Sequence, residues 1–406
     1  MPIMSSFGAL KQQKYSIANN PGFATNWFAS NGLKVISPNG YRLGVKNIGG
    51  TTYTYGRQST TSGTAIFRPF VIGYSPVDGS MSYYKVFSDQ PFVGPPYTQI
   101  VAFEIDSAGN KHFLTDARLS SFKLFKYDSN DVFSLGYTLT ETTEIGGSAG
   151  MIKDSSDNLY ILSYTSTYFI VTKIDPTTYT VIWSKQVTTS ITEGSIRIDN
   201  NNGIYVQTWF NTGVTNTLIK FDTSGNITWQ KTLSGFTAGS VANAIDFDSS
   251  NNIYILNAGL SAGSSVLVAK LDSSGNVLFG KSVPGLGTSA GTWRSLVVND
   301  QNNIVLVHDM PAGANAYTFT FTIDSSGTIL NSVRIGGSIS QPQAYYNIWV
   351  KGTNHIYSTA APLSASNIPI FTIKLPNNND TAYSQAYSFS ITDSGGTTTS
   401  FSGTLI

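Results

Sequence analysis

The segment Asp222-Thr-Ser-Gly-Asn226-Ile-Thr-Trp229-Gln-Lys231 decides the fold, because it returns along the chain at a regular spacing. It recurs as Asp272-Ser-Ser-Gly-Asn276-Val-Leu-Phe279-Gly-Lys281 and, more loosely, from Asp324 to Gly327. The leading positions of all copies are 78, 128, 175, 222, 272, 324 and a degenerate 376, so neighbouring copies are 47 to 52 residues apart. A period of this size indicates a chain built from one supersecondary unit used many times.

Each copy has the chemistry of a tight hairpin turn. An Asp such as Asp222 accepts hydrogen bonds from backbone amides two residues further on, and Gly225 supplies the positive φ that closes the turn. A second set of Asn- and Gly-rich turns alternates with the first. Its members are Pro38-Asn-Gly40, Ser107-Ala-Gly-Asn110, Ser155-Ser-Asp-Asn158, Asn200-Asn-Asn-Gly203, Ser249-Ser-Asn-Asn252, Asp300-Gln-Asn-Asn303 and Gly352-Thr-Asn354.

Two alternating turns per period predict four short strands per unit. In the unit at 195–239 we expect strands at Ser195–Asp199, Ile204–Phe210, Thr217–Phe221 and Ile227–Leu233. The turns predict seven units, at 32–92, 98–140, 147–194, 195–239, 240–291, 292–341 and 342–390. The first unit is irregular, because its strands around Ile66–Ser75 and Ser80–Phe87 follow a long loop. The alternative is therefore six units preceded by a separate N-terminal β module at 1–96.

The repeat resembles the β-propeller repeats of the NHL and bacterial propeller-repeat kind. The resemblance rests on Ile245-Asp-Phe-Asp248-Ser-Ser-Asn-Asn252-Ile-Tyr254 and on Lys220-Phe-Asp222-Thr-Ser-Gly-Asn226-Ile-Thr-Trp229, and it covers about residues 98–340. The second segment is also similar to the sialidase Asp-box, a structural turn, although its Asp stands one residue further from the Gly. The resemblance implies an all-β fold, a β-propeller of four-stranded antiparallel blades. It implies no particular function, because propellers carry many activities.

The composition limits the classes of partner and cofactor that the chain is expected to bind. Charged residues make up 12% of the 406 residues, the formal net charge is +1 and no run of Lys or Arg occurs, which disfavours nucleic acid and anionic lipid. With no cysteine there is neither a disulfide nor a Cys-based metal site, and we expect no cofactor. The N-terminus lacks the apolar core of a secretion signal, and no apolar run is long enough for a membrane span.

The faces of a propeller predict where a ligand binds. Tight turns occupy one face, whereas the other receives long, non-repeating loops at 211–216, 235–239, 257–265, 284–291, 309–316 and 360–367. Loops on a rigid scaffold commonly carry function, and exposed aromatic residues stack on sugars or anchor protein contacts. The candidate ligand-facing residues near this face are Trp209, Phe210, Phe236, Trp293, Asp309 and Tyr345. The alternative for each aromatic residue is packing between neighbouring sheets.

Catalytic and metal motifs are not found in the sequence. His112, His308 and His355 are far apart without metal-ligand spacing, and the pair His308-Asp309 is typical of a surface hydrogen bond. Nucleophile elbow, phosphate-loop and dinucleotide patterns are missing. The turn Asp154-Ser-Ser-Asp157-Asn158 offers oxygen atoms of the kind Ca²⁺ binds, but it lacks the terminal Glu of a full calcium loop, which favours turn capping. The chain is therefore predicted to be no enzyme and to bind no metal.

The two ends lack the repeat. Residues 1–31 resemble an arm for assembly, and 391–406 end in a strand expected to close the ring or to pair with a neighbouring subunit. The chain resembles tailed-bacteriophage virion proteins in its low charge, its many aromatic and small polar residues and its two ends without the repeat. The main hypothesis is a structural protein of the phage tail, baseplate or fibre that is oligomeric within a larger assembly. We expect it to dock through its two ends on other virion proteins and to present its loops to a host surface glycan or protein receptor. The alternatives are an extracellular or bacterial cell-surface lectin-like protein, and a polysaccharide-degrading enzyme.

Overall fold

The computed structural model describes the strands and tight turns of the chain. The described residues are 27–31, 44–48, 51–59, 67–74, 81–87, 99–116, 122–139, 150–165, 167–188, 191, 193–209, 216–233, 243–258, 266–283, 292–299, 301–310, 317–335, 345–350, 354–360, 370–376 and 404–405. Within these ranges every regular element is a β-strand, so the all-β prediction is confirmed. Among the same residues there is no helix long and apolar enough to cross a bilayer.

The strands form antiparallel sheets in which sequence neighbours are paired. The first sheets contain β2 (Gly44–Ile48), β3 (Thr51–Ser59), β4 (Phe67–Tyr74) and β5 (Met81–Val86); then β6 (Gln99–Ile105), β7 (Lys111–Asp116), β8 (Lys123–Tyr127) and β9 (Phe133–Thr138); then β10 (Gly150–Lys153), β11 (Leu159–Tyr164), β12 (Tyr168–Ile174) and β13 (Val181–Thr188). The next are β14 (Glu193–Ile198), β15 (Ile204–Trp209), β16 (Asn216–Phe221) and β17 (Ile227–Leu233); then β18 (Asn243–Phe247), β19 (Ile253–Ala258), β20 (Val266–Leu271) and β21 (Val277–Val283). The last are β22 (Thr292–Val298), β23 (Ile304–Met310), β24 (Tyr317–Ile323) and β25 (Ile329–Ile335); then β26 (Tyr345–Val350), β27 (Asn354–Ala360) and β28 (Ile370–Pro376) with β1 (Trp27–Asn31).

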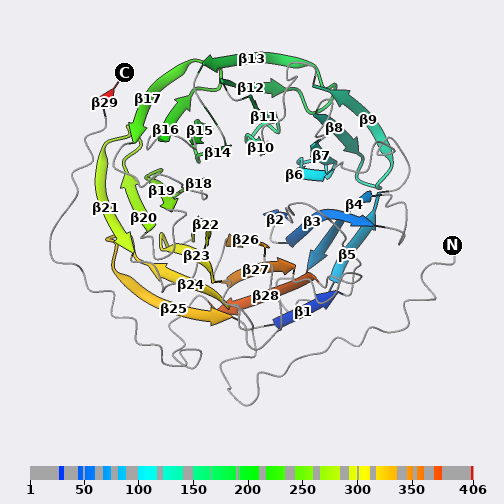
Figure 1. Cartoon of the computed structure of the whole chain (residues 1–406). Coiled ribbons are helices and arrows are strands. Elements are labelled where there is room, and N and C mark those ends of the chain that lie inside the picture. The colour runs from blue at the N-terminus through cyan, green and yellow to red at the C-terminus, as the bar shows by residue number, and fades with distance from the viewer. Residues whose placement is uncertain are drawn as a thin grey trace.

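These sheets stand in a ring around a central axis (Figure 1). The first strand of each sheet lies nearest the axis and its last strand lies at the rim. First strands of neighbouring sheets contact each other in the order β2, β6, β10, β14, β18, β22, β26 and back to β2, so the circuit is closed. Radial four-stranded antiparallel sheets around an axis define a β-propeller, which the turn repeats predicted.

The turns have the local geometry that their sequence requires. In the turn after β16, the amide of Asp222 donates to the carbonyl of Asn226 and the amide of Gly225 donates to the carbonyl of Asp222. Gly225 has a φ of 82°, and the strand register shifts between Lys220 and Phe221. A turn that ends in a left-handed residue followed by a one-residue bulge is a common three-residue hairpin loop.

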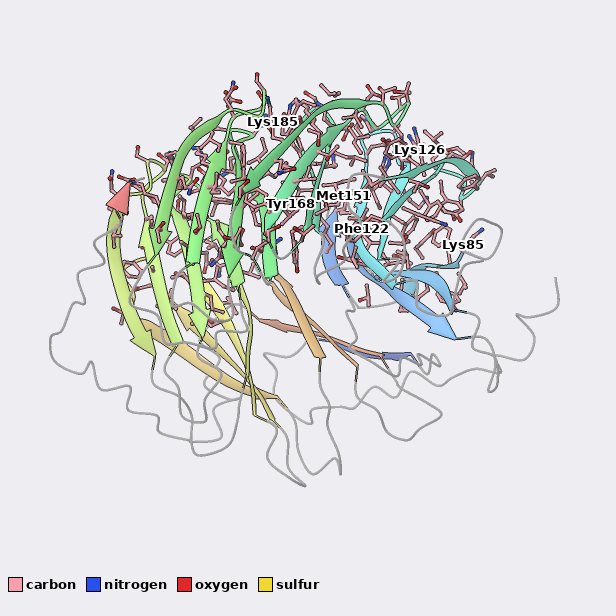
Figure 2. All side chains as sticks on the ribbon, turned by 45° about the horizontal axis from the view of Figure 1, so that its top comes forward. Lys85, Phe122, Lys126, Met151, Tyr168 and Lys185 are labelled. Atoms are coloured by element: carbon pink, nitrogen blue, oxygen red, sulfur yellow. The ribbon has the colours of Figure 1, made fainter. Side chains whose placement is uncertain are left out.

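The core is distributed between the sheets. Phe122 and Met151 belong to a cluster between sheets β6–β9 and β10–β13 (Figure 2). A second cluster joins Tyr160 and Phe169 to Ile196 and Ile204 of the following sheet. The sheet β10–β13 therefore buries apolar residues on both faces, which explains why its strand β11 is buried along its whole length.

The chain ends differ from the expectation. Strand β1, which falls in the expected N-terminal arm at 1–31, pairs antiparallel with β28 and forms the rim strand of the last sheet. It takes the place of the fourth strand of the unit at 342–390, which was expected after the degenerate turn at 376, and it covers an edge whose backbone groups would otherwise lack partners. The C-terminal strand β29 (Thr404–Leu405) pairs with the rim strand β17 instead of with the first blade. In the first sheet β2 ends at Ile48 and β3 begins at Thr51, and these two residues are paired, so the prediction that Pro38–Gly40 forms the first turn of this unit is wrong. Residues 38–40 themselves lie outside the described residues.

Candidate functional site

Four predicted ligand-facing residues lie on described strands. Trp209 is the last residue of β15 and Tyr345 is the first residue of β26. Trp293 lies near the start of β22, and Asp309 lies near the end of β23. Each position is at the strand end opposite the tight turns, so the backbone brings all four to one face of the ring. Thr292 pairs with Asp309 and Trp293 pairs with His308, which places Trp293 and Asp309 at adjacent register positions. Their contact with a ligand stays a prediction, and Phe210 and Phe236 lie outside the described residues.

The opposite face carries the inner turns, which join the first and second strands. In the turn after β14, the Oδ1 atom of Asp199 accepts hydrogen bonds from the amides of Asn201 (2.9 Å) and Gly203 (2.7 Å). Asp154 and Asp248 accept the corresponding bonds in their own turns. The carboxylates of these turns are therefore saturated by local donors. The turn from Asp154 to Asn158 behaves as a capped turn, in line with the favoured interpretation of its sequence.

A buried tyrosine and a lysine complete three of the inner turns, those led by Asp154, Asp199 and Asp248. The Tyr205 hydroxyl donates to Oδ2 of Asp199 at 2.9 Å, and the Lys220 ammonium lies 3.6 Å from the same oxygen and 5.0 Å from the Tyr205 ring centre. Burial and the negative charge of Asp199 raise the pKa of Tyr205. The same arrangement recurs as Asp154, Tyr160, Lys173 and as Asp248, Tyr254, Lys270.

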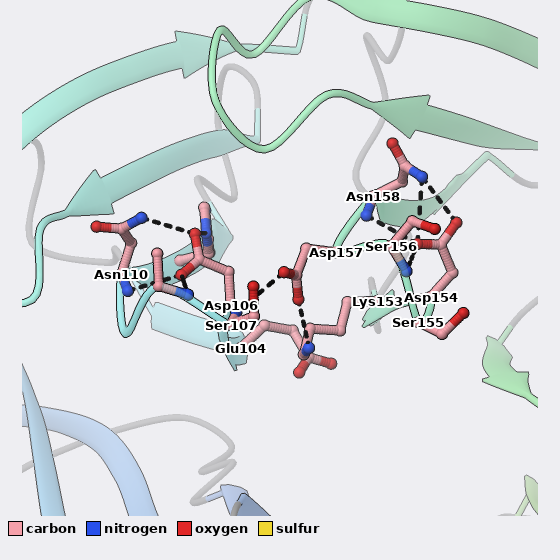
Figure 3. A network of polar contacts seen from close by, with 12 residues as sticks. Glu104, Asp106, Ser107, Asn110, Lys153, Asp154, Ser155, Ser156, Asp157 and Asn158 are labelled. Atoms are coloured by element: carbon pink, nitrogen blue, oxygen red, sulfur yellow. Dashed lines mark hydrogen bonds and ion pairs between the residues drawn. The ribbon is translucent and has the colours of Figure 1, made fainter.

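Neighbouring inner turns are joined to each other. The Oδ1 atom of Asn202 accepts from the amide of Ser155 in the preceding sheet (3.1 Å), and its amide nitrogen donates to the Ser155 hydroxyl (2.9 Å). Asn302 makes the same two bonds to Ser249. One such link, from the Ser107 amide to Asp157, is drawn in Figure 3. The linking residue has a positive φ, for example 62° at Asn202, which Asn and Asp tolerate.

The outer turns, which join the third and fourth strands, are linked in the reverse direction. The Thr223 carbonyl accepts from the Lys173 ammonium (3.3 Å) and from the Trp183 indole (3.1 Å) of the preceding sheet. A Cβ atom at Gly225 would lie 3.0 Å from side-chain atoms of Trp183 and Lys185. Glycine is therefore needed there for its φ and for the close approach of the neighbouring sheet.

His112 occupies the position of the tyrosine in the sheet β6–β9. It is fully buried; its Nε2 atom lies 3.2 Å from Asp106 and its Nδ1 atom 2.9 Å from the Tyr179 hydroxyl. Burial lowers the pKa of His112, and the nearby Asp106 carboxylate only partly offsets that effect. Asp106, His112 and Tyr179 thus form a hydrogen-bonded chain in which His112 and Tyr179 are buried. The side chains of His308 and His355 are not among those described.

Charged residues of successive first strands gather beside the axis. Glu104 on β6 is 1% exposed and forms an ion pair with Lys46 on β2. Burial raises the pKa of Glu104, while Lys46, Lys153 and Arg197 oppose the shift. Lys153 is itself bonded to Asp157 at 2.6 Å (Figure 3). The acidic group of the cluster is closed to solvent, and its ion pair joins two neighbouring first strands.

Sequence reasoning recognised the turns but missed their links. The signal was available in the fourth turn residue, which is Asp or Asn in the linked inner turns and Gly in the outer turns after β16, β20 and β24. Glu104 and Lys46 are 58 residues apart and belong to no repeat motif, so only the ring brings them together. Among the described residues no group of three or more His, Asp or Glu side chains is placed to hold a metal ion.

The fold is similar to solved structures that share little sequence with it. The polysaccharide lyase Uly1 is 11% identical with a TM-score of 0.53, over 89% of this chain and 94% of that chain. BBS1N, solved in complex with ARL6DN, is 10% identical with a TM-score of 0.53, over 88% and 98%. The Dos1 propeller is 12% identical with a TM-score of 0.48, over 86% and 96%. No family model and no curated protein matches the chain. At these identities the similarity establishes the fold alone.

Proposed function

We propose that this chain is a non-enzymatic seven-bladed β-propeller that serves as a structural and attachment protein in the tail, baseplate or fibre of a tailed-bacteriophage virion. The observation that carries the binding function is the placement of Trp209, Trp293, Asp309 and Tyr345 on one face of a closed ring. A rigid scaffold that gathers aromatic and acidic residues at loop ends is suited to recognition. The ring of contacts among first strands supports the blade count.

The surroundings of the charged groups on the face that carries the tight turns favour a binding function over a catalytic one. The carboxylates of Asp154, Asp199 and Asp248 are occupied by their own turns, and His112 and Glu104 are buried. A general acid or base must reach its substrate. The described residues of this face therefore serve stability, and the loop face is the side on which recognition is expected.

The virion assignment rests on the composition and on the two ends. Residues 1–26 and 391–403 lie outside the described residues, and they are the segments we assign to contacts with other virion proteins. Strand β29 adds to the edge of β17, which illustrates how an extended segment joins a rim strand. Such contacts would place the protein in an oligomeric assembly.

Two alternatives to the virion assignment are kept. A lectin-like extracellular or cell-surface protein would use the same loop face. A polysaccharide-degrading enzyme is the second alternative, since the lyase Uly1 carries such an activity on a similar fold, and it requires acidic or aromatic groups that converge at the loop face.

Electron microscopy of the assembly with which the protein co-purifies tests the proposal. Density for the propeller in intact phage particles, with residues 1–26 or 391–406 against other subunits, is the expected result. A free monomer in a bacterial envelope would favour the lectin-like alternative. Depolymerisation of a polysaccharide by the purified chain, measured by the release of reducing or unsaturated ends, would favour the enzyme.

A further inference from the structure

The rim strands of two neighbouring sheets differ in how their outer edges are used. In the sheet β14–β17 the short strand β29 adds to the outer edge of β17. In the sheet β10–β13 the rim strand is β13, and among the described residues no strand pairs with its outer edge (Figure 1). An unpaired edge presents a row of backbone donors and acceptors to an incoming strand. The outer edge of β13 is therefore a place where another strand can add.

Strand β13 has the features of an edge that pairs readily. It is 8 residues long, which makes it longer than the rim strands β5, β9, β17, β21 and β25, and it contains neither glycine nor proline. All of its residues except Trp183 and Val187 are exposed. The exposed fraction is 37% for Val181 and 49% for Ile182. Long edge strands with exposed apolar residues are typical sites of strand addition.

The usual protection of an edge by charge is weak in β13. Its one charged residue is Lys185, whose side chain leans on the outer turn of the next sheet, because a Cβ atom at Gly225 would lie 3.0 Å from it. Trp183 faces the same turn and donates to the Thr223 carbonyl at 3.1 Å. By strand alternation Ser184, Gln186 and Thr188 lie on the other face, which carries no charge. An uncharged strand face next to a free edge does not repel a second strand.

Symmetry limits the ways in which β13 can pair with a second β13. In an antiparallel pair related by a two-fold axis, opposed side chains share a face of the sheet, so one residue lies opposite itself. The two strands overlap over almost their whole length only when that residue is Ser184 or Lys185. Lys185 at the centre would place two ammonium groups opposite each other, which is unfavourable. With Ser184 at the centre, Lys185 lies opposite Trp183 of the other copy, a favourable pairing of a cation with an aromatic ring.

We infer that β13 of one copy pairs antiparallel with β13 of a second copy, centred on Ser184, so that two rings join rim to rim in a two-fold dimer. The place of β13 at the convex rim lets two rings meet edge to edge (Figure 1). The pairing of β29 with β17 is a precedent in the next sheet for strand addition at the rim. This inference goes beyond the proposed function and does not depend on the virion assignment.

Engineered cysteines test the register, because the chain has no cysteine of its own. Ser184→Cys places two thiols opposite each other, where Cβ atoms are about 4.5–5.5 Å apart. Mild oxidation or a short bis-maleimide linker should therefore join most of the protein into covalent dimers, measured by non-reducing gel electrophoresis. Thr188→Cys is the matched control, because it is exposed on the same face of the same strand. Its two thiols would be about 27 Å apart in the dimer and should stay unlinked.

A charge at the two-fold axis tests the dimer itself. Sedimentation equilibrium of wild type over an about 100-fold range of concentration should show a monomer–dimer equilibrium. Ser184→Lys places two ammonium groups opposite each other and should raise the dissociation constant at least about 10-fold. Ser134→Lys makes the same change at an exposed position of the rim strand β9, and each variant removes one serine hydroxyl that is hydrogen bonded. The Ser134→Lys variant should dimerise as wild type does.

Four outcomes overturn the inference. A monomer over the whole concentration range excludes the dimer, while the virion assignment is still judged separately by electron microscopy. A dimer that Ser184→Lys does not weaken more than Ser134→Lys does is formed by another surface. Equal cross-linking of the Ser184→Cys and Thr188→Cys variants excludes the register centred on Ser184. Particle density in which a strand of a different protein covers β13 assigns the edge to that protein and not to a second copy.

Discussion

The inner and outer turns share one sequence pattern but hold the ring together in opposite ways. In the inner turns, the turn itself supplies the linking side chain, as Asn202 does when it bonds to Ser155 of the preceding sheet. In the outer turns the preceding sheet supplies it, as Lys173 and Trp183 do when they donate to the Thr223 carbonyl. One residue marks the difference: position four is Asn or Asp in the linked inner turns and Gly in the turns after β16, β20 and β24.

The difference follows from how far apart the sheets are. Near the axis the turns are close enough for a short Asn side chain to reach the next turn. Toward the rim the sheets diverge, and only long side chains such as Lys and Trp cross the gap. Burial follows the same gradient, because Asp199 is 5% exposed whereas Asp222 is more accessible. We therefore expect changes in the inner turns to cost more stability than equivalent changes in the outer turns.

Acid should weaken both the inner and the outer turns, and it should therefore produce the largest loss of folding stability among these predictions. Burial would raise the pKa of Asp106, Asp248 and Asp272, but hydrogen bonds from their own turns outweigh it and lower the pKa below the usual value. The unfolded chain therefore binds more protons near pH 4. The stabilisation is fully present above the ordinary carboxyl pKa of about 3.9 and is lost as pH falls through the lower folded values. Urea unfolding from pH 7 to pH 2.5 should show a steep fall that begins near pH 4.

Asp248→Asn provides the control for acid unfolding. The variant should be less stable than wild type at pH 7, and its stability should depend less on pH, because one depressed carboxyl is gone. Asp272→Asn in an outer turn should change the profile in the same direction but less. A flat profile for wild type between pH 5 and 3 would contradict the depressed carboxyl pKa values.

The matched pair Asp199→Ala and Asp222→Ala tests the gradient between axis and rim directly. Asp199→Ala leaves the Tyr205 hydroxyl, two turn amides and the nearby Lys220 ammonium buried without their acceptor. We therefore expect the free energy of unfolding to fall by about 3–5 kcal/mol. Asp222→Ala frees donors that water can reach and should cost about 1 kcal/mol. Free energies of unfolding from urea titrations give both values. Equal losses would remove the distinction between inner and outer turns.

Exchanging the fourth residue between the two kinds of turn should lower the free energy of unfolding by less than Asp199→Ala does. Gly225→Asn keeps a residue that tolerates positive φ but places a Cβ atom 3.0 Å from Trp183 and Lys185, so we expect a loss of about 1–3 kcal/mol. Asn202→Gly suits the backbone and removes two exposed hydrogen bonds, at a cost of about 0.5–1 kcal/mol. Thermal unfolding by circular dichroism should rank them in this order. Gly225→Ala places the same Cβ atom without an amide, and it should cost more than Gly225→Asn, because alanine tolerates a positive φ less well than asparagine.

The sequence predicted the fold well where the repeat is strong. The period, the Asp-led turns and the alternation of two turn types predicted the strands of sheet β14–β17 to within a few residues, because hairpin turns are local and their chemistry is visible in five residues. The closure by β1 was missed. Trp27–Asn31 has no repeat motif, and its partner β28 is more than 300 residues away, so nothing local identifies the pair.

The candidate site was predictable only at the level of faces. The connectivity of an up-and-down sheet places Trp209, Trp293, Asp309 and Tyr345 at the ends away from the turns, and the structure has them there. The buried groups depend on contacts between sheets, which a repeat pattern does not specify. Gln207, whose buried amide has no hydrogen-bond partner, was overlooked although Leu162 and Leu256 hold its position in the neighbouring sheets, since the equivalence appears only when the sheets are aligned by register.

The smallest expected effect separates two tryptophans that occupy equivalent register positions in the rim strands. Trp183 pairs with Lys173 and its indole donates to the Thr223 carbonyl; Trp229 pairs with Lys220, but its indole nitrogen is buried without a partner. In the next sheet the corresponding residue is Phe279, which has no such nitrogen. Phenylalanine substitutions remove similar apolar area from both sites, so their difference isolates the hydrogen bond. We expect Trp183→Phe to cost about 0.5–1.5 kcal/mol more than Trp229→Phe, as measured by urea unfolding of the two variants side by side. If Trp229→Phe were the more costly change, the long side chains at the rim would act through packing, and the hydrogen bonds to the outer turns would contribute little to holding the sheets together.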